Sequence, residues 1–168
     1  MNRKAIFFLR SVIVSVLICL FVATSTYGAE YEALDGVDDI KVVFDFSAND
    51  AKMAALYLDL IHQTFKDKNL QIKSKRPDVV VVFHGGTVKL VSSNTERFSD
   101  EEKVVLGQIA NRVSAMAKDG IKLEICVFAV NLLGVDPATI LPEITQVDNG
   151  WISIIGYQAK GYSLVTAF

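Results

Sequence analysis

An unbroken apolar run is the feature that most constrains the fold of this chain. From Asp78 to Gly86 the sequence reads DVVVVFHGG, so five consecutive apolar residues precede a histidine and two glycines. A strand with one face in water alternates apolar and polar residues, whereas a strand covered on both faces does not. We therefore predict that this run is a strand of a parallel sheet with helices on both faces.

Strand and helix patterns alternate on either side of this run. Residues typical of strands occupy 40–47, 78–86, 121–128, 143–147 and 162–168. Residues typical of helices occupy 47–68, 99–120 and 149–162, and 87–94 fits a helical turn or a loop. Alternation of this kind predicts one α/β domain with a mostly parallel five-stranded sheet and helices on both faces.

The first helix has a candidate cap and a candidate inner face. Either Ser47 or Asn49 can cap its N-terminus, and His62 is expected on the solvated side. An apolar residue recurs every four positions along the face expected to be inside: Met53, Tyr57, Ile61 and Phe65.

The second helix begins with a capping signature. Ser99 and Glu102 have the spacing of a capping box, and Gly120 follows the expected end of the helix. Its expected inner face holds four apolar residues: Val105, Ile109, Val113 and Met116.

Residues 1–29 have the layout of a secretory signal peptide. A basic start leads into an apolar run over 11–23, and small and polar residues follow, with cleavage plausible after Gly28 or Ala29. The run is shorter than the roughly 20 residues of a membrane-spanning helix, although an uncleaved anchor remains the alternative. We predict a mature domain over 30–168, periplasmic or secreted, with contact to membrane only through an uncleaved leader.

The charge argues against nucleic acid as a partner. The formal net charge is -2, and loss of the three basic residues of the leader, Arg3, Lys4 and Arg10, would make it -5. A mildly acidic domain without a basic stripe lacks the electrostatic footprint of a protein that binds phosphates.

The mature domain would keep one cysteine. Cys19 lies in the leader, which leaves Cys126 without a partner in its own chain. Exported proteins normally pair their cysteines, so a single thiol indicates a buried inert residue, an intermolecular partner or a reactive site.

Two candidate site residues fall at strand ends. Cys126 ends the third strand pattern, and His84 ends the second and precedes Gly85 and Gly86. In an open parallel sheet, ligands bind at the carboxyl ends of the strands, so both residues are expected at one edge. A helix beginning after Cys126 would favour its thiolate, but a cysteine that only packs and a strand-end histidine that is not a base are the commoner cases.

Other kinds of site find little support in the sequence. Two separated histidines and one cysteine do not make a metal centre without carboxylates, and the double glycine lacks the lysine of a phosphate-binding loop. We expect no cofactor and no metal. Trp151 is expected in the core or at a contact between subunits.

The mature domain resembles the DsrE/DsrF-like family of small sulfur-relay proteins over about residues 40–168. Near the start, KVVFDFS and VVVVFHGG are similar to the strands of family members. In the last third, the matching residues are Cys126, Gly134, Pro142, Gly150, Gln158, Gly161 and Tyr162.

The resemblance implies a fold, an assembly and a role. Family members are parallel α/β sandwiches that form trimers or hexamers, and the sulfur-relay members carry sulfur as a persulfide on a cysteine. Cys126 is the matching residue, with His84 as a candidate helper and a thiol protein as sulfur donor or acceptor. The alternatives are an oligomeric module that binds a small ligand and a structural subunit, neither with covalent chemistry.

Overall fold

The structure, a computed structural model, describes residues 31–71 and 76–168. Residues 36–168 form one compact unit, and the preceding short helix η1 (Glu32–Leu34) belongs to another. The predicted leader, 1–29, lies outside the described residues. Within the described ranges, no helix combines the length and the apolar character needed to cross a membrane.

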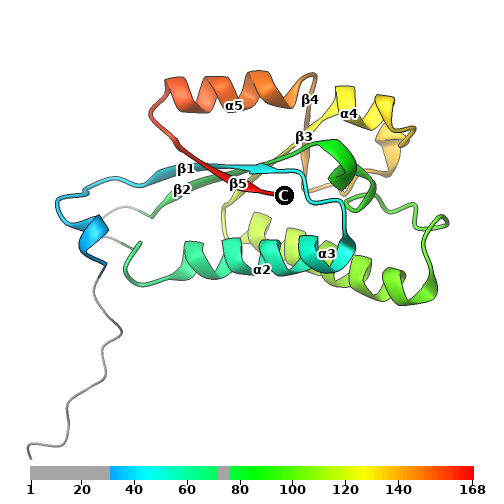
Figure 1. The fold of residues 1–168 in the computed structure, drawn as a ribbon, viewed down its shortest axis with the longest axis horizontal. Coiled ribbons are helices and arrows are strands. Elements are labelled where there is room, and N and C mark those ends of the chain that lie inside the picture. The colour runs from blue at the N-terminus through cyan, green and yellow to red at the C-terminus, as the bar shows by residue number, and fades with distance from the viewer. Residues whose placement is uncertain (1–30, 72–75) are drawn as a thin grey trace, which may run out of the picture. The chain divides into compact units, whose positions relative to one another are not determined.

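A five-stranded parallel sheet forms the middle layer of residues 36–168 (Figure 1). Its strands are β1 (Lys41–Phe46), β2 (Asp78–Phe83), β3 (Lys122–Cys126), β4 (Thr145–Val147) and β5 (Ser163–Ala167). Their order is β4-β3-β2-β1-β5, and every neighbouring pair is parallel. The predicted fold class is therefore confirmed, with the apolar run in the central strand.

Helices cover both faces of the sheet (Figure 1). One face carries α2 (Ala51–Lys66) and α3 (Asp100–Lys118), and the other carries α4 (Val127–Leu132) and α5 (Gly150–Ala159). Two short 3-10 helices, η2 (Gly85–Lys89) and η3 (Pro137–Thr139), lie in the connections. The third strand is shorter than predicted because α4 begins directly after Cys126, and α5 is shorter than the predicted 149–162.

The side chains of β2 explain its unbroken apolar run. Val79, Val81 and Phe83 belong to the large core cluster beneath α2 and α3. Val80 and Val82 belong to a smaller cluster with Ile154 of α5. Because successive side chains of a strand point to opposite faces, a strand with a core on each side has no position for a polar residue.

The first helix differs from its prediction at its start and on its inner face. Asp50 caps α2 by accepting a hydrogen bond from the Met53 amide at 2.8 Å, so neither Ser47 nor Asn49 is the cap. Met53 is 39% exposed, whereas Ile61 and Phe65 are buried. A four-residue step overshoots one turn, so three steps place Met53 about 120° around the helix from Phe65.

The start of α3 confirms the predicted capping box. The Ser99 hydroxyl accepts from the Glu102 amide at 3.3 Å, and the Ser99 amide donates to the Glu102 carboxylate at 2.9 Å. Ile109, Val113 and Met116 are fully buried, as the pattern predicts.

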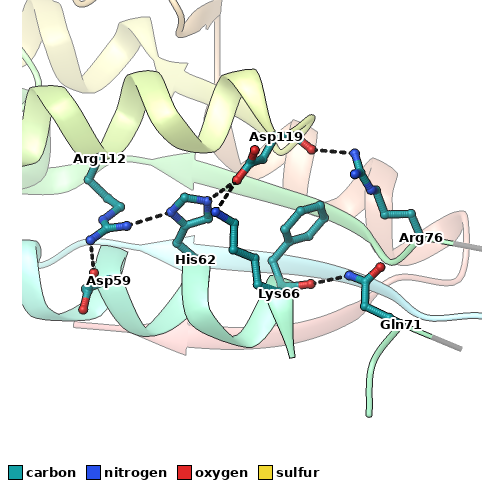
Figure 2. Close-up of polar contacts among 8 residues, drawn as sticks. Asp59, His62, Lys66, Gln71, Arg76, Arg112 and Asp119 are labelled. Carbon is teal, nitrogen blue, oxygen red and sulfur yellow. Dashed lines mark hydrogen bonds and ion pairs between the residues drawn. The ribbon is translucent and has the colours of Figure 1, made fainter. Parts of the chain in front are cut away.

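The prediction for His62 is wrong, because this side chain is buried between α2 and α3 (Figure 2). Its Nε2 lies 2.7 Å from Asp119 Oδ2, and its Nδ1 lies 2.9 Å from Arg112 Nη1. A guanidinium only donates, so Nδ1 must accept, and we assign the proton of the neutral ring to Nε2, which donates to Asp119. Lys66 also reaches Asp119, and Arg112 pairs with Asp59.

A second set of polar contacts fastens α5 and β5 to the sheet. Tyr157 donates to Glu124 of β3 at 2.6 Å, and Tyr162 donates to Asp78 of β2 at the same distance. Burial, followed by the hydrogen bond to Glu124, raises the pKa of Tyr157 well above its ordinary value, so the phenol stays a donor at neutral pH. Lys122 also bonds to Asp78.

Candidate thiol site

A cleft of about 400 Å³ opens where three neighbouring strands end. Its lining comes from residues that follow β2, from residues at the junction of β3 and α4, and from residues between β4 and α5. The lining residues are His84, Gly85, Cys126, Phe128, Ala129, Leu132, Asn149 and Trp151. Both predicted site residues therefore share one cleft at the carboxyl edge of the sheet, where ligands bind in folds of this kind.

Cys126 lies in the inner part of this cleft. It is the last residue of β3 and the residue from which α4 starts. Its thiol makes no disulfide, and the residue is 6% exposed. Phe83 of β2 is in register with Ile125 of β3. The residues that follow them, His84 and Cys126, therefore lie at the same level of the sheet.

The first residue of α5 is pressed against Cys126. A Cβ atom added to Gly150 would lie 3.0 Å from the Cβ of Cys126 and 3.7 Å from its Sγ. It would also lie 3.1 Å from a methyl carbon of Val82. The backbone of Gly150 does not have a positive φ, so this position requires a glycine for space rather than for conformation.

Two backbone anchors hold the segments around the thiol. Asn149 caps α5 through a 3.0 Å hydrogen bond from the Trp151 amide, and its own side chain lines the cleft. At the start of α4, the Phe128 amide donates to the Asp148 carbonyl oxygen at 3.0 Å. The helix after β3 and the segment after β4 are thereby tied together beside Cys126.

Asp45 forms a hydrogen bond with the ring of His84. The Nε2 atom of His84 bonds to the Asp45 carboxylate on β1, and both side chains are largely buried. A carboxylate only accepts, so we assign a proton to Nε2, which leaves Nδ1 as the second nitrogen of the ring. Gly85 follows with a φ of +57°, which lets the chain turn away directly after the histidine.

Sequence reasoning missed Asp45 and the wall residues of the cleft. A lone carboxylate inside the apolar strand KVVFDF was the available signal for Asp45, because a strand interior rarely holds a charge without a partner. Nothing in the local pattern indicated that Asn149 or Leu132 would face the same space as Cys126.

The walls of the cleft are mainly apolar, and its rim is exposed. Phe128, Leu132 and Trp151 are 64%, 70% and 66% exposed. Trp151 is therefore not a core residue, and a contact with another molecule is the part of its prediction that stays open. The lining residues include neither lysine nor arginine. In the described part of the chain, no three His, Cys, Asp or Glu side chains gather in a group suited to a metal ion.

The comparison with protein families gives a match for nearly the whole compact unit. The model of the DsrE/DsrF-like family matches residues 41–167. The chain belongs to the DsrE/DsrF-like family. The family match begins at the first residue of β1 and ends at the last residue of β5, so the sheet and the cleft both lie inside it.

The relatives of this DsrE/DsrF-like chain carry no stated activity. An uncharacterized protein of Aquifex aeolicus (strain VF5) is 26% identical over 127 residues, which are 75% of this chain and 55% of the relative. The chain thus spans about half the length of that curated relative.

Two solved structures share the fold of this family member. A protein of unknown function from Methanobacterium thermoautotrophicum, MTH1491, superimposes with a TM-score of 0.59 at 18% identity, over 76% of this chain and 99% of that one. A conserved protein of unknown function from Bacteroides thetaiotaomicron, BT1422, gives 0.50 at 19% identity, over 75% and 93%. Membership of the DsrE/DsrF-like family supports a sulfur-relay-related role at the level of the family.

Proposed function

We propose that this protein carries sulfur as a persulfide on Cys126. The observation that carries the proposal is the shared cleft, which the free thiol and an aspartate-bound histidine both line at the carboxyl edge of the sheet. A nucleophilic thiol needs a base or a positive charge close by, and His84 is the ionisable side chain that lines the cleft beside Cys126.

Loading is a thiol exchange at sulfur. The Cys126 thiolate attacks the outer sulfur of a donor persulfide, R–S–SH, and a new S–S bond forms as the donor S–S bond breaks. The donor leaves as R–S⁻ and takes up a proton, and Cys126 becomes a persulfide. Unloading reverses the roles, because an acceptor thiolate attacks the outer sulfur and Cys126 leaves as thiolate. No external oxidant or reductant is consumed.

His84 would take the proton of the Cys126 thiol during loading. Asp45 fixes Nε2 as a donor, so Nδ1 is the nitrogen that accepts this proton. The carboxylate would then stabilise the charged ring, as the third member of a nucleophile, base and orienting-acid arrangement does.

The apolar walls bear on the identity of the donor. The residues lining the cleft supply no lysine or arginine to neutralise an anion such as an inorganic polysulfide. The exposed Phe128, Leu132 and Trp151 instead suit an apolar surface on a thiol protein that delivers or receives the sulfur. Because Cys126 is recessed, the partner sulfur must enter the cleft to reach it.

Intact-mass measurement after exposure to an alkyl persulfide tests the carrier. We expect a gain of one sulfur atom on the wild-type protein, reversed by dithiothreitol, and no gain on Cys126→Ser. His84→Ala should load at least about tenfold more slowly at neutral pH, because a positioned base contributes about 10²–10⁴ to such steps. Circular dichroism checks that both variants keep the fold.

A module that binds a small ligand without covalent chemistry is the second candidate. The apolar lining and the recessed thiol favour it, since ligand pockets are concave and mainly apolar. Alkylation of Cys126 only after denaturation, together with the absence of a sulfur adduct, would contradict the carrier and leave this candidate. A structural subunit would give the same thiol result and would bind no apolar dye in the cleft.

We propose that the protein works in the periplasm or is secreted. The basic start and short apolar run of residues 1–29 support this location. N-terminal sequencing of the protein from fractionated cells should find a start near Ala29 or Glu30 outside the cytoplasm. An intact Met1 in the membrane fraction would instead indicate an anchor.

A further inference from the structure

One edge of the sheet is formed by β5, whose only neighbour in the sheet of the described chain is β1. The Ala167 carbonyl oxygen accepts from the Ser47 amide at 2.8 Å, so the backbone groups of Ala167 point toward the β1 side. Backbone groups alternate in direction along a strand. Those of Leu164 and Thr166 therefore point away from the sheet, at its open edge.

This edge lacks the protections that natural sheet edges usually have. Its sequence, SLVTA, contains neither a charged residue nor a proline. Leu164 is 40% exposed and Val165 is 43% exposed, and they face opposite sides of the sheet. In the sheet, Leu164 lies beside Val43, which belongs to the smaller cluster under α5. Val165 lies beside Phe44, which belongs to the large core cluster under α2 and α3.

An apolar groove runs beside the edge on the α2 side. It has a volume of about 290 Å³, and residues of α2 and of β5 line it. Leu60 of α2 and Phe168 contribute to its wall, and they are 48% and 68% exposed. The open hydrogen-bonding edge and an exposed apolar surface therefore occupy the same place on the molecule.

We propose that β5 pairs in antiparallel fashion with β5 of a second copy, around a two-fold axis, to give one continuous ten-stranded sheet. In this register Leu164 faces Thr166 of the partner subunit, and the two exchange both backbone hydrogen bonds. Thr166 and Leu164 of the partner subunit do the same. The outward-pointing backbone groups of all four residues therefore have hydrogen-bond partners. Val165 meets its own copy on the axis.

Self-pairing fits this edge because the strand is complementary to itself. An isologous contact brings each residue near the axis close to its own copy, so a charge there would lie close to a like charge. The strand has no charge, and Val165 against Val165 is an apolar contact between β-branched side chains. The Cys126 cleft, built on the ends of β2, β3 and β4, does not include β5, so the pairing is independent of the sulfur chemistry.

Engineered cross-linking tests the pairing and its register. In a Cys126→Ser background, Val165→Cys should give a covalent dimer on mild oxidation. Opposite residues of a non-hydrogen-bonded pair lie about 4.5 Å apart at Cα, within the range of a disulfide. Leu164→Cys is the matched control, because its copy lies on a diagonal about 7–8 Å away, and it should cross-link at least tenfold more slowly. Equal cross-linking of the two variants, or none from Val165→Cys, would overturn the proposal.

Light scattering on the protein without added cysteines supplies a second measurement. Val165→Lys should halve the molar mass of the particle at micromolar concentration while circular dichroism stays unchanged. Val104→Lys, an equally conspicuous change at a 64% exposed position of α3, should leave the mass as it is. A monomeric wild-type protein, or an oligomer whose mass Val165→Lys does not alter, would refute the β5 contact.

Discussion

Replacement of Gly150 by valine should lower the free energy of unfolding by about 1–3 kcal/mol, the usual cost of overpacking a filled interior. Even the first added carbon meets the Cβ of Cys126 at 3.0 Å and a methyl of Val82 at 3.1 Å. Val82 is fully buried and Cys126 nearly so, and neither can move aside without disturbing the sheet. Gly150→Ala should give a smaller loss of the same sign, measured by chemical denaturation.

A second glycine of α5 provides the matched control. Gly156 has no heavy atom within 4 Å of its potential Cβ, so Gly156→Ala should be neutral or should stabilise the protein by up to about 1 kcal/mol. If both substitutions stabilise the protein, the contact between α5 and Cys126 is not tight.

Substitution of Gly150 should also affect the proposed sulfur chemistry. An added side chain at Gly150 must displace Cys126 or the start of α5, and small displacements of reacting groups lower rates strongly. We expect Gly150→Ala to slow sulfur loading of the folded protein, whereas Gly156→Ala should load at the wild-type rate.

Removal of the His62 ring should cost about 2–4 kcal/mol of the free energy of unfolding. His62 is 2% exposed, and it joins α2 to α3 through Asp119 on one side and Arg112 on the other. His62→Ala loses packing in a buried position and two hydrogen bonds with charged partners. Thr64→Ala, on the exposed side of the same helix, should change stability by less than about 0.5 kcal/mol. Equal effects from both variants would argue against the contact.

The His62 cluster also predicts how stability responds to acid. The hydrogen bond from Lys66, followed by that from His62, lowers the pKa of Asp119 from 3.8 to about 2. Since the carboxylate is favoured in the folded state, its stabilising contribution is present above pH 3.8 and is lost as the pH falls toward 2. Asp119→Asn should remove this part of the acid dependence, whereas Asp100→Asn, at a fully solvated helix start, should keep it.

The layered fold was predictable because its signals are local. An unbroken apolar run requires cover on both faces, and the alternation with helical patterns then leaves few topologies. The presence of His84 and Cys126 at one cleft followed from the same reasoning, because the carboxyl ends of adjacent parallel strands lie side by side. Similar logic predicted the Ser99 capping box, which involves residues only three positions apart.

The missed contacts of the two histidines depend on distant parts of the chain. His84 and Asp45 are 39 positions apart, and His62 and Asp119 are 57 apart. Each histidine has an ordinary sequence environment, and its burial becomes visible only when a second helix or strand supplies the partner. Of the two places predicted for Trp151, its exposure at the start of α5 excludes the core, and the contact between subunits stays a prediction.

The position of β1 within the sheet has a consequence for synthesis of the protein. This strand is the first in the described part of the chain, yet it lies between β2 and β5, and its partners on one side are residues 163–167. While the chain emerges from the ribosome, β1 therefore keeps one side unpaired until nearly the whole domain has been made. Closure of so long a loop makes the contact late and the folding slow, and the unpaired side can meanwhile join foreign strands. A chaperone that holds the nascent chain would have its greatest effect during this interval.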